Sequence, residues 1–418
     1  IAFFAAILLS CFTGVDFNLS FWGDVERMLG VFHILHFLVF YFIIITVMRT
    51  RNDWLNLLAL SVGAAVLVSL YSFKINYSTI GNSAYVGGYL IFNIYFAMIL
   101  FFSRRGRIVK LALPAAMILM LVVLEKTSVA GAYVGLGAGA FLFLFLYGFL
   151  NKNKKVKVAA LSAVAMAVIL ILLLFIERDS SFAQNNNFLR FLTGEMSLSK
   201  NTFQTRLISW KAAWLDFPDH PILGAGFGNY SITFDKYFDP KFYNHTRTET
   251  YFDRAHNNLI DIASTAGLTG LLTYLSIFAA AGYYLLRGFK RGDINLGDFT
   301  LLVSLIVAYF IQNLAVFDSL VTYFSLMITL GFIYWLSESG KEMPIIKDEP
   351  FLNREIYALF FAGILALGII YQYNIKPAKM LRGAINGQYL IARGDFEEGM
   401  EEYKKALETI DGLLRKRE

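Results

Sequence analysis

Apolar runs recur along most of the chain, and each holds roughly 17–22 residues, enough to cross about 30 Å of hydrocarbon as an α-helix. Of the 418 residues, 57% are hydrophobic and only 16% are charged, whereas a soluble domain has about 45–50% apolar and about 25% charged residues. These runs predict an all-α fold in which the chain forms a polytopic bundle of membrane helices.

We expect eleven spanning helices, near residues 1–13, 31–48, 55–72, 85–102, 111–124, 131–150, 158–176, 257–286, 298–316, 320–337 and 356–372. Because the chain starts at Ile1 inside the first run, we expect it to be processed or trimmed there. Loops on one side carry most basic residues, in clusters at 49–51, 104–110, 152–157, 287–291 and 341–354. The positive-inside rule places this side in the cytoplasm.

Two polar segments interrupt the apolar pattern, and this topology places both outside the membrane on the extracytoplasmic side. The predicted organisation is N-terminal membrane helices at 1–176, an extracytoplasmic loop at 177–255, C-terminal membrane helices at 256–372 and an extracytoplasmic tail at 373–418. A loop this long in a tight bundle is usually functional. The alternative is a solvated cap that only covers the bundle.

The tail between Asn386 and Glu408 predicts two short helices with a turn at Gly394 and Asp395. It resembles a tetratricopeptide unit, except that Gly399 stands where that family usually has alanine. One unit cannot bury its apolar face alone. We therefore expect the 386–408 repeat to dock on the membrane domain or on a protein partner, or to be followed by further repeats.

The sequence predicts no metal site, no cofactor and no nucleic-acid partner. Cys11 is the single cysteine, so the chain has no internal disulfide and no cysteine-based metal site. His33 and His36 lie one helical turn apart without a third ligand, and we expect them to serve helix packing. Glycines recur every fourth residue along the sixth predicted helix, which predicts a close-packing face formed by Gly131, Gly135 and Gly139.

The long loop begins with a predicted helix from Thr202, its cap, to Phe217, before Pro218. Arg206 and Trp210 are four residues apart and share one helix face. A guanidinium beside an aromatic ring suits a phosphate next to a sugar; the alternative is an Arg206 that only packs on Trp210. The glycine-rich turn that follows allows a ligand to approach the backbone, which makes Gly226 and Asn229 candidate substrate contacts.

His256 stands where the loop meets the eighth predicted helix, in the sequence Asp253-Arg254-Ala255-His256-Asn257. An imidazole beside a fixed cation suits a general base for a sugar hydroxyl, and repulsion from Arg254 would keep it neutral. The alternative is a histidine that caps the helix. Asp253, Arg254 and Asn257 are candidate substrate contacts. Arg27, at the outer mouth of the second helix, either joins them or anchors that helix near lipid headgroups.

The stretch from Arg206 to Tyr230, with FDRAHNN and the GLTGLLTYL helix after it, resembles the O-antigen ligase superfamily. Supporting segments are FWGDVERMLG, IGNSAYVGGYL and QNLAVFDSL. The resemblance implies a membrane-embedded, inverting, metal-independent glycosyltransferase in the bacterial cytoplasmic (inner) membrane, with its active site facing outward among membrane lipids. Its donor would be a glycan on undecaprenyl pyrophosphate.

The resemblance also implies residue roles. Arg206 matches the loop arginine that binds the pyrophosphate, and His256 matches the histidine that activates the acceptor hydroxyl. The family often has an arginine where this chain has Ala130, so Arg27, Arg254 or Lys126 would replace it.

The acceptor stays open among a lipid A core (ligase), a growing glycan (polymerase) and a protein (oligosaccharyltransferase). Alternatives of another class are a lipid or polysaccharide transporter and a non-catalytic scaffold. Mid-membrane stretches nearly free of ionisable residues count against an ion-coupled transporter.

Overall fold

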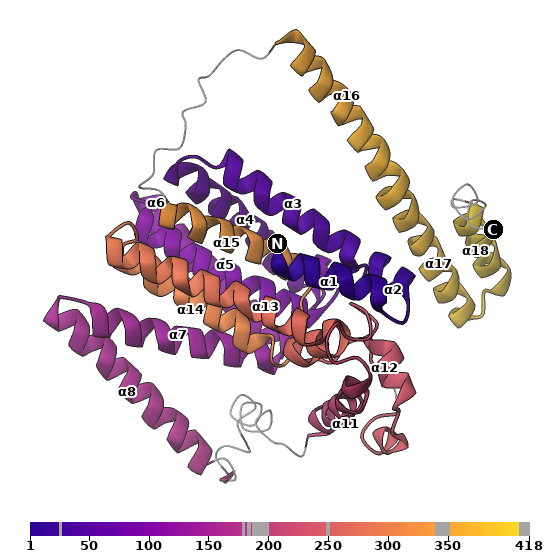
Figure 1. Ribbon diagram of the computed structural model, residues 1–418, viewed down its shortest axis with the longest axis horizontal. Helices are drawn as coiled ribbons and strands as arrows, with labels where there is room; N and C mark the ends of the chain where they lie inside the picture. The colour runs from indigo at the N-terminus through magenta and orange to yellow at the C-terminus, as the bar shows by residue number, and fades with distance from the viewer. Residues whose placement is uncertain are drawn as a thin grey trace. The chain divides into compact units, whose positions relative to one another are not determined.

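A computed structural model describes residues 1–24, 27–177, 180–181, 185, 200–247, 251–338 and 352–408, and every regular element within these ranges is helical (Figure 1). The basic residues predicted at 341 and 347 lie outside the described ranges. The chain divides into two compact units, Ile1–Met343 and Pro344–Glu418. The last membrane helix therefore groups with the tail and not with the other membrane helices.

Eight described helices are long and apolar enough to cross a membrane. They are α4 (Arg51–Ser72), α5 (Ser83–Ser103), α6 (Arg107–Thr127), α7 (Ala130–Leu150), α8 (Lys154–Ile176), α13 (Asn258–Arg291), α15 (Leu320–Glu338) and α16 (Asn353–Ile370). Three shorter apolar helices are α1 (Ala2–Thr13), α3 (Val31–Val47) and α14 (Leu296–Gln312). The chain is thus an all-helical, multi-pass membrane protein, and the count of eleven spans stays a prediction.

Helices such as α4 and α5 begin where capping residues stand, and not where the apolar runs begin. α4 begins at Arg51, four residues before the predicted start, because Thr50 and Asp53 form a reciprocal capping box. α5 begins after Asn82, whose side chain accepts the backbone N–H of Ala84 at 2.8 Å. The charged and polar first turns of such helices extend the spans beyond their apolar cores.

Within the first unit, α5 is buried along most of its length, and α7 packs along α14. The predicted close-packing face of α7 is confirmed. A Cβ on Gly135 would lie 2.6 Å from the Ala308 carbonyl oxygen, and a Cβ on Gly139 would lie 2.8 Å from that of Ser304. Glycine at these positions lets the two backbones approach closely.

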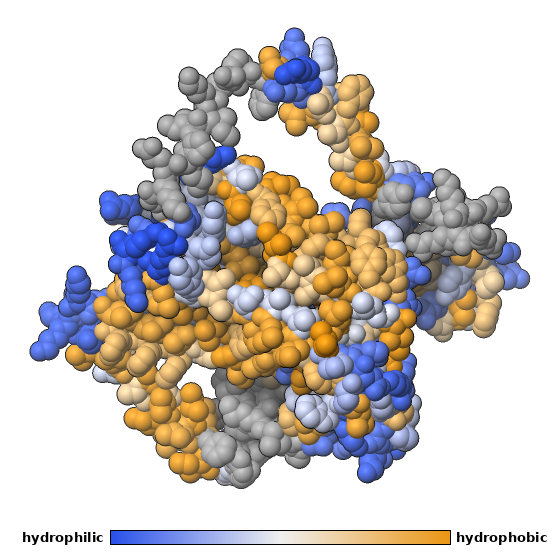
Figure 2. All heavy atoms as spheres, in the orientation of Figure 1, coloured by the Kyte–Doolittle hydropathy of each residue, from blue (hydrophilic) through white to orange (hydrophobic). Residues whose placement is uncertain are grey.

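The two ends of this bundle differ in character. The turns that join α7 to α8 and α13 to α14 lie at the left end of Figure 1, whereas α11 (Asn201–Asp216) and α12 (Tyr230–Lys236) lie at the opposite end. Figure 2 shows apolar residues over the helices and hydrophilic residues gathered toward these ends. The basic clusters at 152–157 and 287–291 therefore lie on the side away from α11 and α12.

The second unit is helical from α16 through a π-helical turn (Tyr371–Ile375) into α17 (Lys376–Arg393), so the chain does not leave the helix near residue 372 as predicted. Gly394 (φ 95°) then turns the chain into α18 (Phe396–Glu408), as the sequence predicts. A Cβ on Gly399 would lie 2.9 Å from the Gly387 carbonyl oxygen, which explains why alanine is absent there. The tetratricopeptide identity stays a prediction.

Candidate functional site

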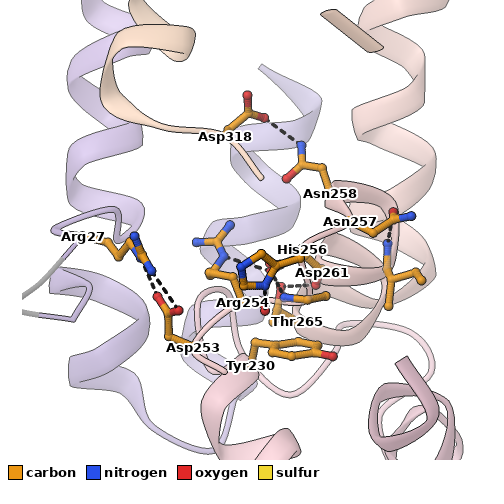
Figure 3. Close-up of polar contacts among 12 residues, drawn as sticks. Arg27, Tyr230, Asp253, Arg254, His256, Asn257, Asn258, Asp261, Thr265 and Asp318 are labelled. Atoms are coloured by element: carbon orange, nitrogen blue, oxygen red, sulfur yellow. Dashed lines mark hydrogen bonds and ion pairs between the residues drawn. The ribbon is translucent and has the colours of Figure 1, made fainter. Parts of the chain in front are cut away.

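The candidate site lies at the start of α13, where three segments distant in sequence meet (Figure 3). His256 comes two residues before the first residue of α13 and has φ 52°, in the left-handed region that non-glycine residues seldom adopt. Asn257 caps the helix, because its side chain accepts the backbone N–H groups of Leu259 (3.0 Å) and Ile260 (3.3 Å). His256 is therefore not the helix cap, and its strained backbone needs another explanation.

The His256 imidazole is neutral and has a defined tautomer. Its Nδ1 lies 3.1 Å from the Arg254 carbonyl oxygen, and a carbonyl only accepts, so Nδ1 carries the hydrogen and Nε2 keeps its lone pair. Burial, and then the nearby Arg206 charge, lower the pKa of His256 to about 4. The sequence predicted neutrality correctly but assigned it to Arg254. Burial is the larger cause, and the principal repelling cation is Arg206.

Aromatic rings account for much of this burial. The His256 ring lies between Phe252 and Phe317, with centroid distances of 4.7 Å and 5.2 Å. Phe252 belongs to the small apolar core of the loop segment, together with Ala213, Tyr230, Phe234, Phe242 and Ala255. Neither flanking ring was identified from the sequence as part of the site.

Arg254 is buried beside the start of α13, and its Nε side is linked to Asp261 (Figure 3). It is 4% exposed, and its Nε donates to Asp261 at 2.9 Å. The same Asp261 oxygen accepts the backbone N–H of Ala255 at 2.9 Å. Arg254 thus holds the His256 segment on α13, and because its guanidinium is turned inward we do not retain it among the proposed phosphate ligands.

Arg27 and Asp253, 226 positions apart, form a two-point ion pair beside this segment. Arg27 donates to the two Asp253 carboxylate oxygens at 2.6 and 3.1 Å, and to the Tyr85 hydroxyl at 2.7 Å. Burial acts to raise the pKa of Asp253, but the Arg27 pair together with the nearby Arg254 charge outweighs it, so that the pKa lies below its usual value. The structure therefore brings Arg27 beside Asp253 and the His256 segment, although Arg27 is far from both in the sequence.

α11 carries Arg206 and Trp210 and runs along the loop side of the site. Trp210 Nε1 donates to the Ala255 carbonyl oxygen at 2.7 Å, so its indole fixes the residue before His256. Arg206 is half-buried, and its charge acts on the His256 imidazole. The predicted Thr202 cap is wrong: the N-cap is Lys200, which makes no side-chain cap bond, and the helix ends at Asp216.

The glycine-rich turn packs against a break in α13. Gly267, inside α13, has φ 64°, and a Cβ on Gly224 would lie 2.4 Å from the Ala266 nitrogen. The backbone N–H of Gly226 donates to the Thr265 carbonyl at 3.0 Å. Asn229 is fully buried and bonds to Ser20 Oγ and to the backbone carbonyls of Asp16 and Ala225. These contacts serve packing between protein segments, so Gly226 and Asn229 are left out of the proposed site.

A buried polar cluster behind the site was missed from the sequence. Asp318, between α14 and α15, is fully buried and accepts hydrogen bonds from Tyr309, Asn258 (2.7 Å) and Asn313 (3.0 Å). Asn258 is the first residue of α13, so the cluster ties that helix to α14 and α15. The available signal was a single charged residue within the QNLAVFDSL segment between two apolar runs, where buried charges are costly.

The other polar candidates lie elsewhere. Within the described ranges, no group of three or more His, Cys, Asp or Glu residues could hold a metal. His36 Nδ1 bonds to the Phe32 carbonyl in its own helix, and the His33 and His36 ring centroids are 6.4 Å apart. Lys126 Nζ lies 3.4 Å from the Ser72 carbonyl and stacks on Phe73, at the ends of α4 and α6.

Comparison with known proteins finds a family model that matches the loop and its neighbouring helices. No curated protein matches the chain. A family model described as O-antigen ligase matches residues 115–275, a segment that contains Arg206, Trp210 and His256 but neither Arg27 nor Phe317. This match supports the resemblance to the O-antigen ligase superfamily and a membrane glycosyltransferase-like function.

Proposed function

We propose that this protein is an inverting, metal-independent glycosyltransferase that moves a glycan from undecaprenyl pyrophosphate to an acceptor hydroxyl on the outer face of the bacterial cytoplasmic membrane. The observation that carries the proposal is His256. It presents a neutral imidazole with its lone pair on Nε2, near the Arg206 charge, inside the segment matched by the O-antigen ligase family. The outer location is favoured because the basic clusters at 152–157 and 287–291 lie at the end of the bundle away from α11 and α12.

His256 would act as general base. Nε2 takes the proton of the acceptor hydroxyl while the hydroxyl oxygen bonds to the anomeric carbon, and the bond from that carbon to the pyrophosphate oxygen breaks. A single displacement inverts the anomeric centre. The low pKa of His256 keeps the imidazole in its accepting form throughout the neutral range. Polyprenyl pyrophosphate leaves as a weak base, so it needs no general acid.

Arg206 would hold the pyrophosphate, because a planar guanidinium can donate two parallel hydrogen bonds to phosphate oxygens. Arg27 is the second cation of the proposed site, with part of its charge balanced by Asp253. Of the three cations considered as replacements at Ala130, Arg27 is retained. Arg254 is turned inward onto Asp261, and Lys126 contacts the end of α4.

The proposal leaves three acceptors, which a deletion strain separates. Unligated lipid-linked polymer would accumulate if the protein is a ligase, single repeat units if it is a polymerase, and unglycosylated target protein if it is an oligosaccharyltransferase. The second helical unit is compatible with a protein partner through residues 386–408, which favours the last two acceptors.

The decisive experiment is transfer from a purified lipid-linked donor by reconstituted wild type and His256→Ala. Loss of a positioned proton acceptor should lower turnover about 10²–10⁴-fold while donor binding survives. The matched control is His245→Ala, since His245 also lies on the loop segment but is only half-buried and bonds to Asn201. Near-normal turnover in His256→Ala would refute the role of His256 as general base. A wild-type protein that transfers no glycan would favour the transporter or the scaffold.

A further inference from the structure

One aromatic ring contacts the proposed base and two cations at once. The Phe317 ring meets the His256 ring edge to face, with centroids 5.2 Å apart and an interplanar angle of 82°. Its centroid also lies 5.0 Å from Cζ of Arg27 and 5.4 Å from Cζ of Arg254. Phe317 comes from the link between α14 and α15, outside the segment matched by the O-antigen ligase family.

These contacts are attractive and directional. An aromatic face carries negative charge that attracts a guanidinium within about 6 Å, and aromatic rings favour edge-to-face contacts. Arg27 and Arg254 are therefore held by Phe317 as well as by their carboxylate partners, Asp253 and Asp261. The ring keeps both cations at set positions around His256.

Phe317 is itself held firmly. Phe317 is 3% exposed, and the next residue, Asp318, is fixed by hydrogen bonds from Tyr309 of α14, from Asn313 at the end of α14 and from Asn258 of α13. The His256 ring also packs against Phe252. The imidazole thus lies between one ring from the loop segment and one ring from the α14–α15 link.

We propose that Phe317 is a positioning residue for the transferase, whose ring fixes the orientation of the His256 imidazole, excludes water from it and holds the two arginines at defined places around it. The inference rests on the proposed function and adds to it a residue that contributes no proton and no charge.

The electrostatic surroundings give this role a measurable signature. His256 faces Arg206 from α11, Arg27 from the N-terminal segment, and Asp253 and the Arg254 carbonyl from its own segment. Burial lowers its pKa more than any of these groups does. Removal of the Phe317 ring admits water, so the pKa of His256 should rise from about 4 toward its ordinary value near 6.5. The pH below which transfer slows should then increase, because an imidazolium cannot accept a proton.

The test combines an NMR titration of the labelled His256 ring, assigned with His256→Gln, and the pH profile of transfer from lipid-linked donor. Phe317→Ala should raise both midpoints by about one pH unit or more and lower turnover. Phe317→Tyr, which keeps the ring, should restore both. The control Phe332→Ala removes a buried ring of α15 that packs on Trp54, and it should leave both midpoints unchanged.

An unchanged His256 titration midpoint in Phe317→Ala would overturn the inference, even if turnover falls. If that variant does not fold, Phe317→Leu replaces it, with a smaller upward shift expected and an unmoved midpoint again overturning the inference. A wild type that transfers no glycan would refute the proposed function alone, because the NMR titration still reports whether the ring sets the state of His256.

Discussion

Replacing Asp261 by asparagine should release the His256 segment from α13. The Asp261 carboxylate accepts both Arg254 Nε and the Ala255 N–H at 2.9 Å, and its side chain and that of Arg254 are 0% and 5% exposed. Asparagine leaves a buried guanidinium without its counter-charge, which costs about 3–5 kcal/mol. Since about 1.4 kcal/mol is a factor of ten, local opening of this segment should become about 10²–10⁴-fold more populated.

Amide hydrogen exchange at residues 253–258, in detergent, measures this opening. The double variant Arg254→Met/Asp261→Leu removes both charges and should recover most of the protection except at Ala255, whose N–H loses its acceptor, so that a double-mutant cycle shows strong coupling. Asp298→Asn, which breaks the Arg51 pair at the other end of the bundle, is the control and should not affect this segment. Exchange within twofold of wild type in Asp261→Asn would refute the prediction that Asp261 holds the His256 segment on α13. A folded, protected Arg254→Met protein that cannot bind donor would make Arg254 a phosphate ligand after all.

Two further predictions concern the donor site and the topology. Arg206→Ala should abolish transfer and Arg206→Lys should recover little of it, because lysine cannot donate two parallel hydrogen bonds to phosphate. The control is Lys211→Ala, at an exposed position of the same helix, which should transfer normally. Substantial activity in Arg206→Lys would show that only the charge of Arg206 matters. The topology is tested with single cysteines at the exposed positions Tyr243 and Asp395 in a Cys11→Ser background. Both should react with an impermeant maleimide on intact spheroplasts. Labelling only after permeabilisation would show that the predicted topology is reversed.

The sequence predicts the fold well where hydropathy alone decides it. Long apolar runs must be helical in lipid, because a helix satisfies its own backbone hydrogen bonds, and each predicted run corresponds to a helix in the structure. Deviations arise where local hydrogen bonds override hydropathy. α14 ends at Gln312 and not at 316, because the chain there turns toward Asp318, and α13 is broken at Gly267 by the packing of the glycine-rich turn.

The site was predictable only in part, because a sequence shows which residue types are near but not where their side chains turn. His256 stands out as a polar group at a loop–membrane junction, and Arg206 as a cation on the same helix face as Trp210 in the loop. Arg254, only two positions from His256, is by sequence equally suited to phosphate, yet its partner Asp261 lies one helical turn into α13 and draws it inward. Phe317 could not be identified, since a phenylalanine in an apolar segment is indistinguishable from lipid-facing bulk until the fold brings it to His256.

The loop segment and the membrane bundle together determine the geometry of His256. Ala255, its neighbour, is held at both ends: its carbonyl accepts the Trp210 indole of α11, and its N–H donates to Asp261 of α13. On the other side, Asn257 is fixed as the cap of α13. With both neighbours fixed, His256 takes φ 52°, a conformation that costs about 1–3 kcal/mol and persists only where surrounding contacts enforce it. The segment that carries α11 therefore helps to hold the strained residue, because Trp210 fixes the Ala255 carbonyl while Asp261 fixes the Ala255 N–H.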